Sequence, residues 1–269
     1  DTLSKDIYCC HLELSLISYG VNVTVRSNDS EVFERLSKYL PPDWQPAICY
    51  DTSILYSLVV RSLNAKWRYY IYRGAETLID TATIEELLDR FDSDLRLQIA
   101  IAVEDKLFVH AGVVAWKGKA IVIPGRSFSG KTTLVAAFVR AGATYYSDEY
   151  AVFDINGLVY PYPRPLSVRQ SERERVKRCS VEVFGGTVGT SPLSVGLIVH
   201  TKYEVGAVWK PIVISPGQAI LALLDNTIVA RLRPDFALPI LSKSVCNALS
   251  VEGMRGEMDE TAAALLRQL

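Results

Sequence analysis

Residues 125–132 read Gly-Arg-Ser-Phe-Ser-Gly-Lys-Thr, which matches the G-x-x-x-x-G-K-T pattern of a phosphate-binding loop. The apolar run 120–124 precedes the loop, and the helix-like segment 133–140 follows it. In such a unit, backbone N–H groups and the helix N-terminus surround phosphate oxygens, the lysine contacts them, and the threonine binds Mg²⁺. We therefore expect a nucleotide to contact Gly125, Arg126, Ser127, Phe128, Ser129, Gly130, Lys131, Thr132 and Thr133.

An acidic pair and a histidine lie near this loop in the sequence. Asp148 and Glu149 end the strand-like run 143–147, and only one expected helix separates them from the loop. Carboxylates in this place can bind Mg²⁺ or accept a proton. Upstream, His110 closes the apolar run 107–109. A histidine at a strand end is either structural or titrates near neutral pH, and both interpretations stay open.

These residues together carry a family resemblance. His-Ala-Gly at 110–112, Gly-Arg-Ser-x-x-Gly-Lys-Thr at 125–132 and Asp-Glu at 148–149 resemble the catalytic domain of the bacterial HPr kinase/phosphorylase family in residue type and spacing. The resemblance covers about residues 100–169 with specific motifs and the rest of the C-terminal part more loosely. It implies an α/β fold with a mixed α+β sheet, of the PEP-carboxykinase-like P-loop kinase type.

The expected division of the chain has two parts. The resemblance implies a P-loop catalytic domain over residues 82–269. Residues 1–81 carry no recognised motif, and we expect them to form a smaller α+β domain of unassigned role.

The resemblance also implies roles for the site residues. Asp148 would be the general base that accepts the proton of the acceptor hydroxyl, and His110 would lie beside Asp148 and orient it. Thr132 and Glu149 would bind Mg²⁺, and Lys131 would neutralise charge on the γ-phosphate.

Two arginines follow the acidic pair on an expected strand. Arg164 and Arg169 can neutralise the charge on the transferring group, with Arg169 the stronger candidate. The alternative is that both are surface arginines in the proline-rich stretch 160–165 and just beyond it.

The sequence also departs from the family pattern. Glu149 stands where the family has Asp, Phe128 stands where it has Gly, and no Glu-x-Arg-Gly-x-Gly segment is found. The resemblance therefore favours a kinase of this fold over the specific substrate HPr or the reverse phosphorylase reaction.

The expected activity is an ATP- and Mg²⁺-dependent kinase that phosphorylates a hydroxyl. The acceptor favoured by the resemblance is a serine of a protein or peptide, either an HPr-like protein or a precursor of a peptide natural product. A small-molecule hydroxyl and an acceptor-free nucleotide-binding ATPase or regulatory switch remain alternatives. The sequence leaves open the acceptor, the donor nucleotide and the oligomeric state, including a homo-oligomer.

Composition narrows the class of protein. The chain has 269 residues, 49% of them hydrophobic and 22% charged, which is typical of globular enzymes. A net charge of −1 gives no basic surface for nucleic acid. The sequence lacks an 18-residue apolar stretch, so we expect no membrane span. The five cysteines lack metal-ligand spacing and fit free thiols in a reducing cytoplasm.

Local patterns predict several elements, and some motifs have two interpretations. Residues 154–157 match the D-x-x-G pattern of GTPases, but Asn156-Gly157 between apolar residues favours a hairpin turn. Residues 184–192 contain three glycines and no charge, which predicts either a mobile lid near the acceptor or a plain surface connection. The expected elements are a hairpin around Gly20, a helix capped by Ser30, strands at 54–61, 67–73, 164–169, 193–200 and 207–214, and helices at 83–104, 216–224, 235–249 and 257–269.

Overall fold

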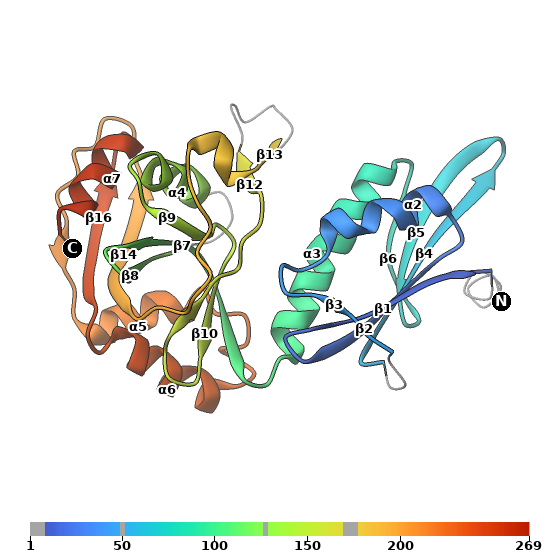
Figure 1. The fold of residues 1–269 in the computed structure, drawn as a ribbon, viewed down its shortest axis with the longest axis horizontal. Helices are drawn as coiled ribbons and strands as arrows, with labels where there is room; N and C mark the ends of the chain where they lie inside the picture. The colour runs from blue at the N-terminus through green and yellow to red at the C-terminus, as the bar shows by residue number, and fades with distance from the viewer. Residues whose placement is uncertain (1–8, 49–51, 126–128, 169–176, 269) are drawn as a thin grey trace. The chain divides into compact units, whose positions relative to one another are not determined.

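The computed structural model describes residues 9–48, 52–125, 129–168 and 177–268 of a mixed α/β protein. The chain divides into two compact units, Asp1–Glu104 and Asp105–Leu269. The division falls after residue 104, whereas the sequence pattern predicted it near residue 81. Figure 1 labels the elements of both units.

The first unit is built on one sheet. Its strands are β1 (Leu12–Ser18), β2 (Val21–Ser27), β3 (Gln45–Pro46), β4 (Ile54–Leu63), β5 (Lys66–Arg73) and β6 (Glu76–Thr81). Their order in the sheet is β3-β1-β2-β4-β5-β6, and β2 runs parallel to β4. Tyr19 and Gly20, with φ of 48° and 78°, form the turn of the expected β1–β2 hairpin. Two consecutive positive φ angles suit the right-handed twist of the paired strands.

The helices of the first unit explain why the two units divide after Glu104. They are α2 (Ser30–Arg35), the 3₁₀ helix η1 (Leu36–Tyr39) and α3 (Ile84–Ala102). The apolar stripe of α3, with Leu87, Phe91 and Leu95 buried, packs on β5, β6 and η1. A buried carboxylate, Asp94, accepts a hydrogen bond from the Tyr56 hydroxyl at 2.7 Å and two from Arg73 Nη1 at 2.8 Å. Helix α3 therefore belongs to the first unit and does not open the second.

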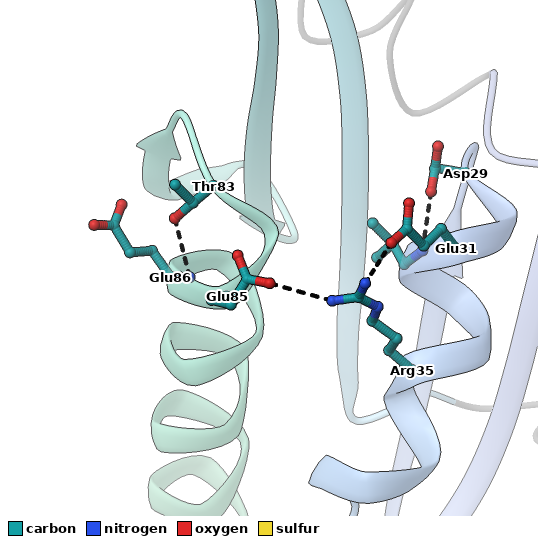
Figure 2. A network of polar contacts seen from close by, with 7 residues as sticks. Asp29, Glu31, Arg35, Thr83, Glu85 and Glu86 are labelled. Atoms are coloured by element: carbon teal, nitrogen blue, oxygen red, sulfur yellow. Dashed lines mark hydrogen bonds and ion pairs between the residues drawn. The ribbon is translucent and has the colours of Figure 1, made fainter. Parts of the chain in front are cut away.

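Side-chain caps and one arginine fix the starts of α2 and α3, as Figure 2 shows. Asp29 accepts a hydrogen bond from Val32 N at 2.9 Å, so the expected helix is capped one residue before Ser30. Thr83 caps α3 through Glu86 N at 3.4 Å. Between the helices, Arg35 contacts Glu31 and, at 3.3 Å, Glu85. These ion pairs are exposed and contribute little to stability. Burial of the apolar stripe of α3 therefore supplies most of the free energy that holds this helix on the sheet.

The second unit contains an eight-stranded sheet and a separate strand pair. The strands are β7 (Lys106–Trp116), β8 (Lys119–Pro124), β9 (Thr144–Ser147), β10 (Tyr150–Asp154), β11 (Val159–Tyr160), β12 (Leu166–Val168), β13 (Lys177–Cys179), β14 (Val195–Tyr203), β15 (Ile212–Val213) and β16 (Leu249–Arg255). The sheet order is β11-β10-β7-β8-β14-β16-β15, with β9 also paired to β7, while β12 pairs only with β13. The expected β10–β11 hairpin turns at Asn156-Gly157, and Asp154 accepts the turn's N–H groups. The D-x-x-G match is therefore a turn.

Helices cover both faces of the large sheet. They are α4 (Lys131–Arg140), the 3₁₀ helix η2 (Val181–Phe184), α5 (Pro216–Leu224), α6 (Pro234–Val245) and α7 (Met258–Leu266). One buried apolar cluster joins the sheet to α5 and α6, and the other joins it to α4 and α7 (Figure 1). Gly112 on β7 lets α4 approach closely, because a Cβ there would lie 2.6 Å from Val135 Cγ2.

Three parallel strands bring their carboxyl ends to one edge of this sheet. β14 pairs in parallel with both β8 and β16. The loop after β8 therefore lies near the last residues of β16, although more than a hundred residues separate them. In open α/β sheets, ligands bind at this edge.

Residues 184–192 do not form the expected mobile lid. The segment lies along β9: Tyr145 N donates to Thr187 O and Gly189 N donates to Tyr145 O, both at 2.8 Å. The Tyr146 hydroxyl also donates to Ser191 O at 2.8 Å. Glycine is required at position 189 because a Cβ would collide with the Tyr146 ring. The glycines therefore permit close packing, and the prediction of a lid was wrong.

We expect Gly189→Ala to destabilise the protein by about 1–3 kcal/mol, because the added methyl group must displace the Tyr146 ring from a packed site. Urea unfolding would measure the loss. Gly217→Ala is the control, since nothing lies within 4 Å of a Cβ at this helical position. Equal stability of the Gly189→Ala variant and the parent would show that the segment is loosely held.

Two further observations concern the described residues alone. No helix among them has both the length and the apolar character needed to cross a membrane. Among them, Cys9, Cys179 and Cys246 are free thiols.

Candidate phosphate-binding site

The predicted phosphate loop joins β8 to α4, as the strand–loop–helix pattern requires. Gly125 follows the end of β8, Gly130 is the N-cap of α4, and Lys131, Thr132 and Thr133 form the first turn of the helix. Arg126, Ser127 and Phe128, which the sequence also predicted to contact the nucleotide, lie outside the described residues.

The two glycines of the motif meet different steric demands. A Cβ at Gly125 would lie 2.7 Å from Ser129 Oγ. Gly130 has φ of +79°, a left-handed conformation that suits glycine, and a Cβ there would collide with Arg255 Nη2. A side chain at either position would displace a neighbouring side chain, Ser129 in one case and Arg255 in the other.

Lys131 is a buried cation close to two carboxylates. Its relative exposure is 9%. Burial lowers the pKa of Lys131, while the charges of Glu149 and Asp148 act in the opposite direction. The acidic pair and the lysine therefore share one electrostatic site, and a nucleotide phosphate would add negative charge to it.

Asp148 is buried in a network of hydrogen bonds behind the loop. Its Oδ2 accepts from Thr132 Oγ1 at 3.1 Å and from Ser167 N at 3.3 Å. The Tyr145 hydroxyl lies 3.1 Å from Asp148 Oδ1 and 2.8 Å from Arg164 O, so one proton faces two acceptors. Burial raises the pKa of Asp148, and these hydrogen bonds only partly oppose it. A protonated Asp148 can donate to the Tyr145 phenol oxygen, and the phenol proton can then go to Arg164 O. Each acceptor of the network then has a donor.

Glu149, and not Asp148, is the carboxylate beside His110. The distance from His110 Nδ1 to Glu149 Oε1 is 3.7 Å. His110 lies on β7 opposite Tyr150 of β10, and its ring centroid is 4.7 Å from that of Tyr150. Its backbone N–H donates to Asn226 O at 2.7 Å, which fixes this part of β7.

The two acidic residues therefore have the opposite partners from those expected. The family resemblance implied that His110 lies beside Asp148 and that Thr132 and Glu149 together bind Mg²⁺. In the structure, the Ser147 hydroxyl accepts from Glu149 N and Tyr150 N at 3.1 and 3.0 Å and forms a tight turn between β9 and β10. Asp148 therefore contacts Thr132 on α4, and Glu149 contacts His110 on β7.

The structure describes one of the two candidate arginines, Arg164, and not the other, Arg169. Arg164 lies beside the Asp148 network, because its carbonyl oxygen accepts from Tyr145. Arg169 lies outside the described residues.

Sequence reasoning missed Arg255, the last residue of β16. This arginine is only 2% exposed, and its Nη2 donates to Ser129 O at 3.2 Å and to Gly130 O at 3.0 Å. No motif marks it, because its relation to the loop depends on the pairing of β8, β14 and β16. A weak alternation over residues 249–255 was the only local sign of a strand.

A cavity of about 280 Å³ opens at the same edge of the sheet. His200, Lys202, Lys210, Ile212, Glu252 and Met254 contribute to its lining. His200 Nδ1 lies 3.2 Å from Glu252 Oε1, and the cavity is lined by two lysines and this one carboxylate together with apolar side chains.

The oxygen atoms at the loop suit a hard cation. Thr132 Oγ1 and the Asp148 carboxylate are adjacent, and Mg²⁺ in nucleotide sites takes one or two protein oxygens together with phosphate oxygens. Among the described residues, no group of three His, Cys, Asp or Glu side chains is arranged to hold a metal on its own.

Comparison with known proteins finds similar solved structures, among them an HPr kinase, but no match by sequence. No family model matches the chain, and no curated protein matches it. The structure of the Hpr(Ser) kinase/phosphatase from Coxiella burnetii matches with 11% sequence identity and a TM-score of 0.31, over 60% of this chain and 96% of that chain. Likeness at this level does not assign the chain to a family.

Proposed function

We propose that this chain is an ATP- and Mg²⁺-dependent kinase that transfers the γ-phosphoryl group to a hydroxyl. The observation that carries the proposal is the grouping of Lys131, Thr132, Asp148 and Glu149 at the start of α4. Phosphoryl transfer needs a phosphate cradle, a cation, charge neutralisation and a carboxylate that accepts the acceptor's proton. This group of residues supplies protein groups for each of these needs.

The contacts favour roles for Asp148 and Glu149 that are the reverse of those implied by the family resemblance. Thr132 and Asp148 would hold Mg²⁺, as the P-loop Thr and the acidic residue after the neighbouring strand do in P-loop enzymes. When bound, the metal would neutralise charge on the phosphates. Glu149, with a side chain 31% exposed, can be reached by an acceptor, whereas Asp148 is enclosed. Glu149 would accept the hydroxyl proton, and His110 would orient Glu149 and share that proton.

In the proposed reaction, the acceptor oxygen attacks the γ-phosphorus as its proton passes to Glu149. The bond from the γ-phosphorus to the bridging oxygen breaks, and ADP leaves. Lys131 and the loop N–H groups stabilise the charge on the transferring group and on ADP.

The favoured acceptor class is a serine of a protein or peptide. A small-molecule hydroxyl is the second candidate, and an acceptor-free ATPase or switch is the third. The cavity lined by Lys202 and Lys210 lies at the same sheet edge and suits an acceptor that carries negative charge.

We expect label from γ-labelled ATP to appear in an acceptor rather than only in inorganic phosphate. The full chain would be incubated with ATP or GTP, Mg²⁺ and, in separate reactions, HPr, serine-containing acidic peptides and small polyols. Transfer should require ATP and an acceptor. Release of inorganic phosphate alone, at one rate with every acceptor, would instead support the acceptor-free ATPase.

A further inference from the structure

Arg255 fixes the direction of the last peptide groups of the phosphate loop. Its guanidinium Nη2 donates to the carbonyl oxygens of Ser129 and Gly130. In a trans peptide, the carbonyl and the N–H of the next residue point in opposite directions. The N–H groups of Gly130 and Lys131 therefore point away from Arg255, toward the side of the loop where a phosphate would lie.

The charge of Arg255 has no partner of opposite sign among the described residues. The guanidinium forms no ion pair there, its Nε is buried without a hydrogen-bond partner, and burial lowers the pKa of the group. The guanidinium also lies against the Tyr203 ring, whose centroid is 5.4 Å from Cζ. Neutral carbonyls and a ring only partly replace water around a buried cation. A polyanion bound on the other side of the loop would supply the missing negative charge.

Gly130 and Arg255 are sterically matched. The space that a Cβ at position 130 would take is filled by Arg255 Nη2. The glycine of the phosphate motif thus admits the guanidinium as well as the left-handed turn. Arg255 therefore packs against the loop and is hydrogen-bonded to it at the same point.

We infer that Arg255 is a positioning residue for the polyphosphate of the nucleotide. It holds the N–H groups of the loop toward the phosphates, and its positive charge offsets the negative charge of the phosphates from the opposite side of the loop. The inference deepens the proposed function and rests on it for the identity of the anion. Arg255 contacts loop carbonyls and not the phosphates, so its effect falls on binding more than on the transfer step.

Binding of inorganic pyrophosphate, ADP and ATP to the whole 269-residue chain tests this role by calorimetry. We expect Arg255→Met to weaken pyrophosphate and ATP binding by roughly 10- to 100-fold, the range for losing a charge-assisted hydrogen bond. KM for ATP should rise by a similar factor, with a smaller fall in kcat. Arg255→Lys keeps the charge but loses the planar fork, so it should recover part of the affinity.

Arg140→Met is the matched control. Arg140 lies at the other end of α4, is exposed and pairs with Asp259 at 2.7 Å, so its loss should leave pyrophosphate binding unchanged. If Arg255→Met fails to fold, Arg255→Lys, which keeps the length of the side chain, decides the question by the same titration.

The outcomes separate this inference from the proposed function. Parental pyrophosphate affinity in the folded Arg255 variant, together with lost affinity in Lys131→Ala, would overturn the role of Arg255 and leave the phosphate loop intact. Parental affinity in both variants would overturn the phosphate loop itself, and the inference with it. Equal weakening in Arg255→Met and Arg140→Met would show a general effect of lost charge.

Discussion

Lys131→Ala is expected to abolish phosphoryl transfer and to weaken ATP binding. The substitution removes the cation proposed to contact the γ-phosphate, and no other lysine of the described residues is buried in the loop region. Transfer would be measured with γ-labelled ATP, and affinity by calorimetry. Burial lowers the pKa of this lysine, so its charge depends on the neighbouring carboxylates and the phosphates.

The control for this prediction is Lys38→Ala, an exposed lysine in the first unit. It removes the same charge without touching the loop, and activity should stay at the parental level. Lys131→Arg should retain part of the ATP affinity, because the charge remains. Transfer at the parental rate by Lys131→Ala would contradict the assignment of the phosphate loop.

Opposite kinetic effects are expected from the two acidic residues. Glu149→Gln should lower kcat by about two to four orders of magnitude with little change in Mg·ATP affinity, as expected for loss of a general base. Asp148→Asn should instead raise the Mg²⁺ concentration needed for half-maximal activity and weaken Mg·ATP binding. The reverse pattern would restore the roles implied by the family resemblance, with Asp148 as the base and Glu149 on the metal.

Stability gives a second measure of Asp148→Asn. Burial raises the pKa of Asp148 above its ordinary value of 3.8, so the folded, nucleotide-free protein holds a proton there more readily than the unfolded chain does. Such a group stabilises the fold below about pH 3.8, and this contribution is lost as the pH rises through the raised pKa. Asparagine stays neutral, and its amide can donate to the Tyr145 oxygen. Thermal melts should therefore find the variant more stable than the parent at neutral pH, although less active.

The position of the phosphate loop could be predicted from the sequence because its determinants are local. An apolar strand, two glycines and a helix that starts at Lys131 specify the strand–loop–helix unit within about twenty residues. The hairpins at Gly20 and at Asn156-Gly157 were predictable for the same reason, since the positive φ angles at Tyr19, Gly20 and Gly157 depend on the residues of the turn itself.

Local pattern could not assign α3 or residues 184–192 correctly. Helical periodicity predicted that α3 would form, but burial of its apolar stripe on β5 and β6 decided which unit it belongs to. Glycine content suggested mobility at 184–192, but a glycine can equally permit close packing. The Tyr146 ring, which fills the space beside Gly189, decided between these two meanings.

The sequence by itself determined which chemical groups are present: a lysine and a threonine at a helix start, an acidic pair after the next strand, and a histidine before the loop. Tertiary structure alone decided their partners. A single turn at Ser147 directs Asp148 to Thr132 and Glu149 to His110. Parallel pairing of β8, β14 and β16 brings Arg255 to the loop carbonyls. The physical reason is that side-chain direction in a turn and pairing between distant strands depend on the packing of the whole sheet, which no short stretch of sequence encodes.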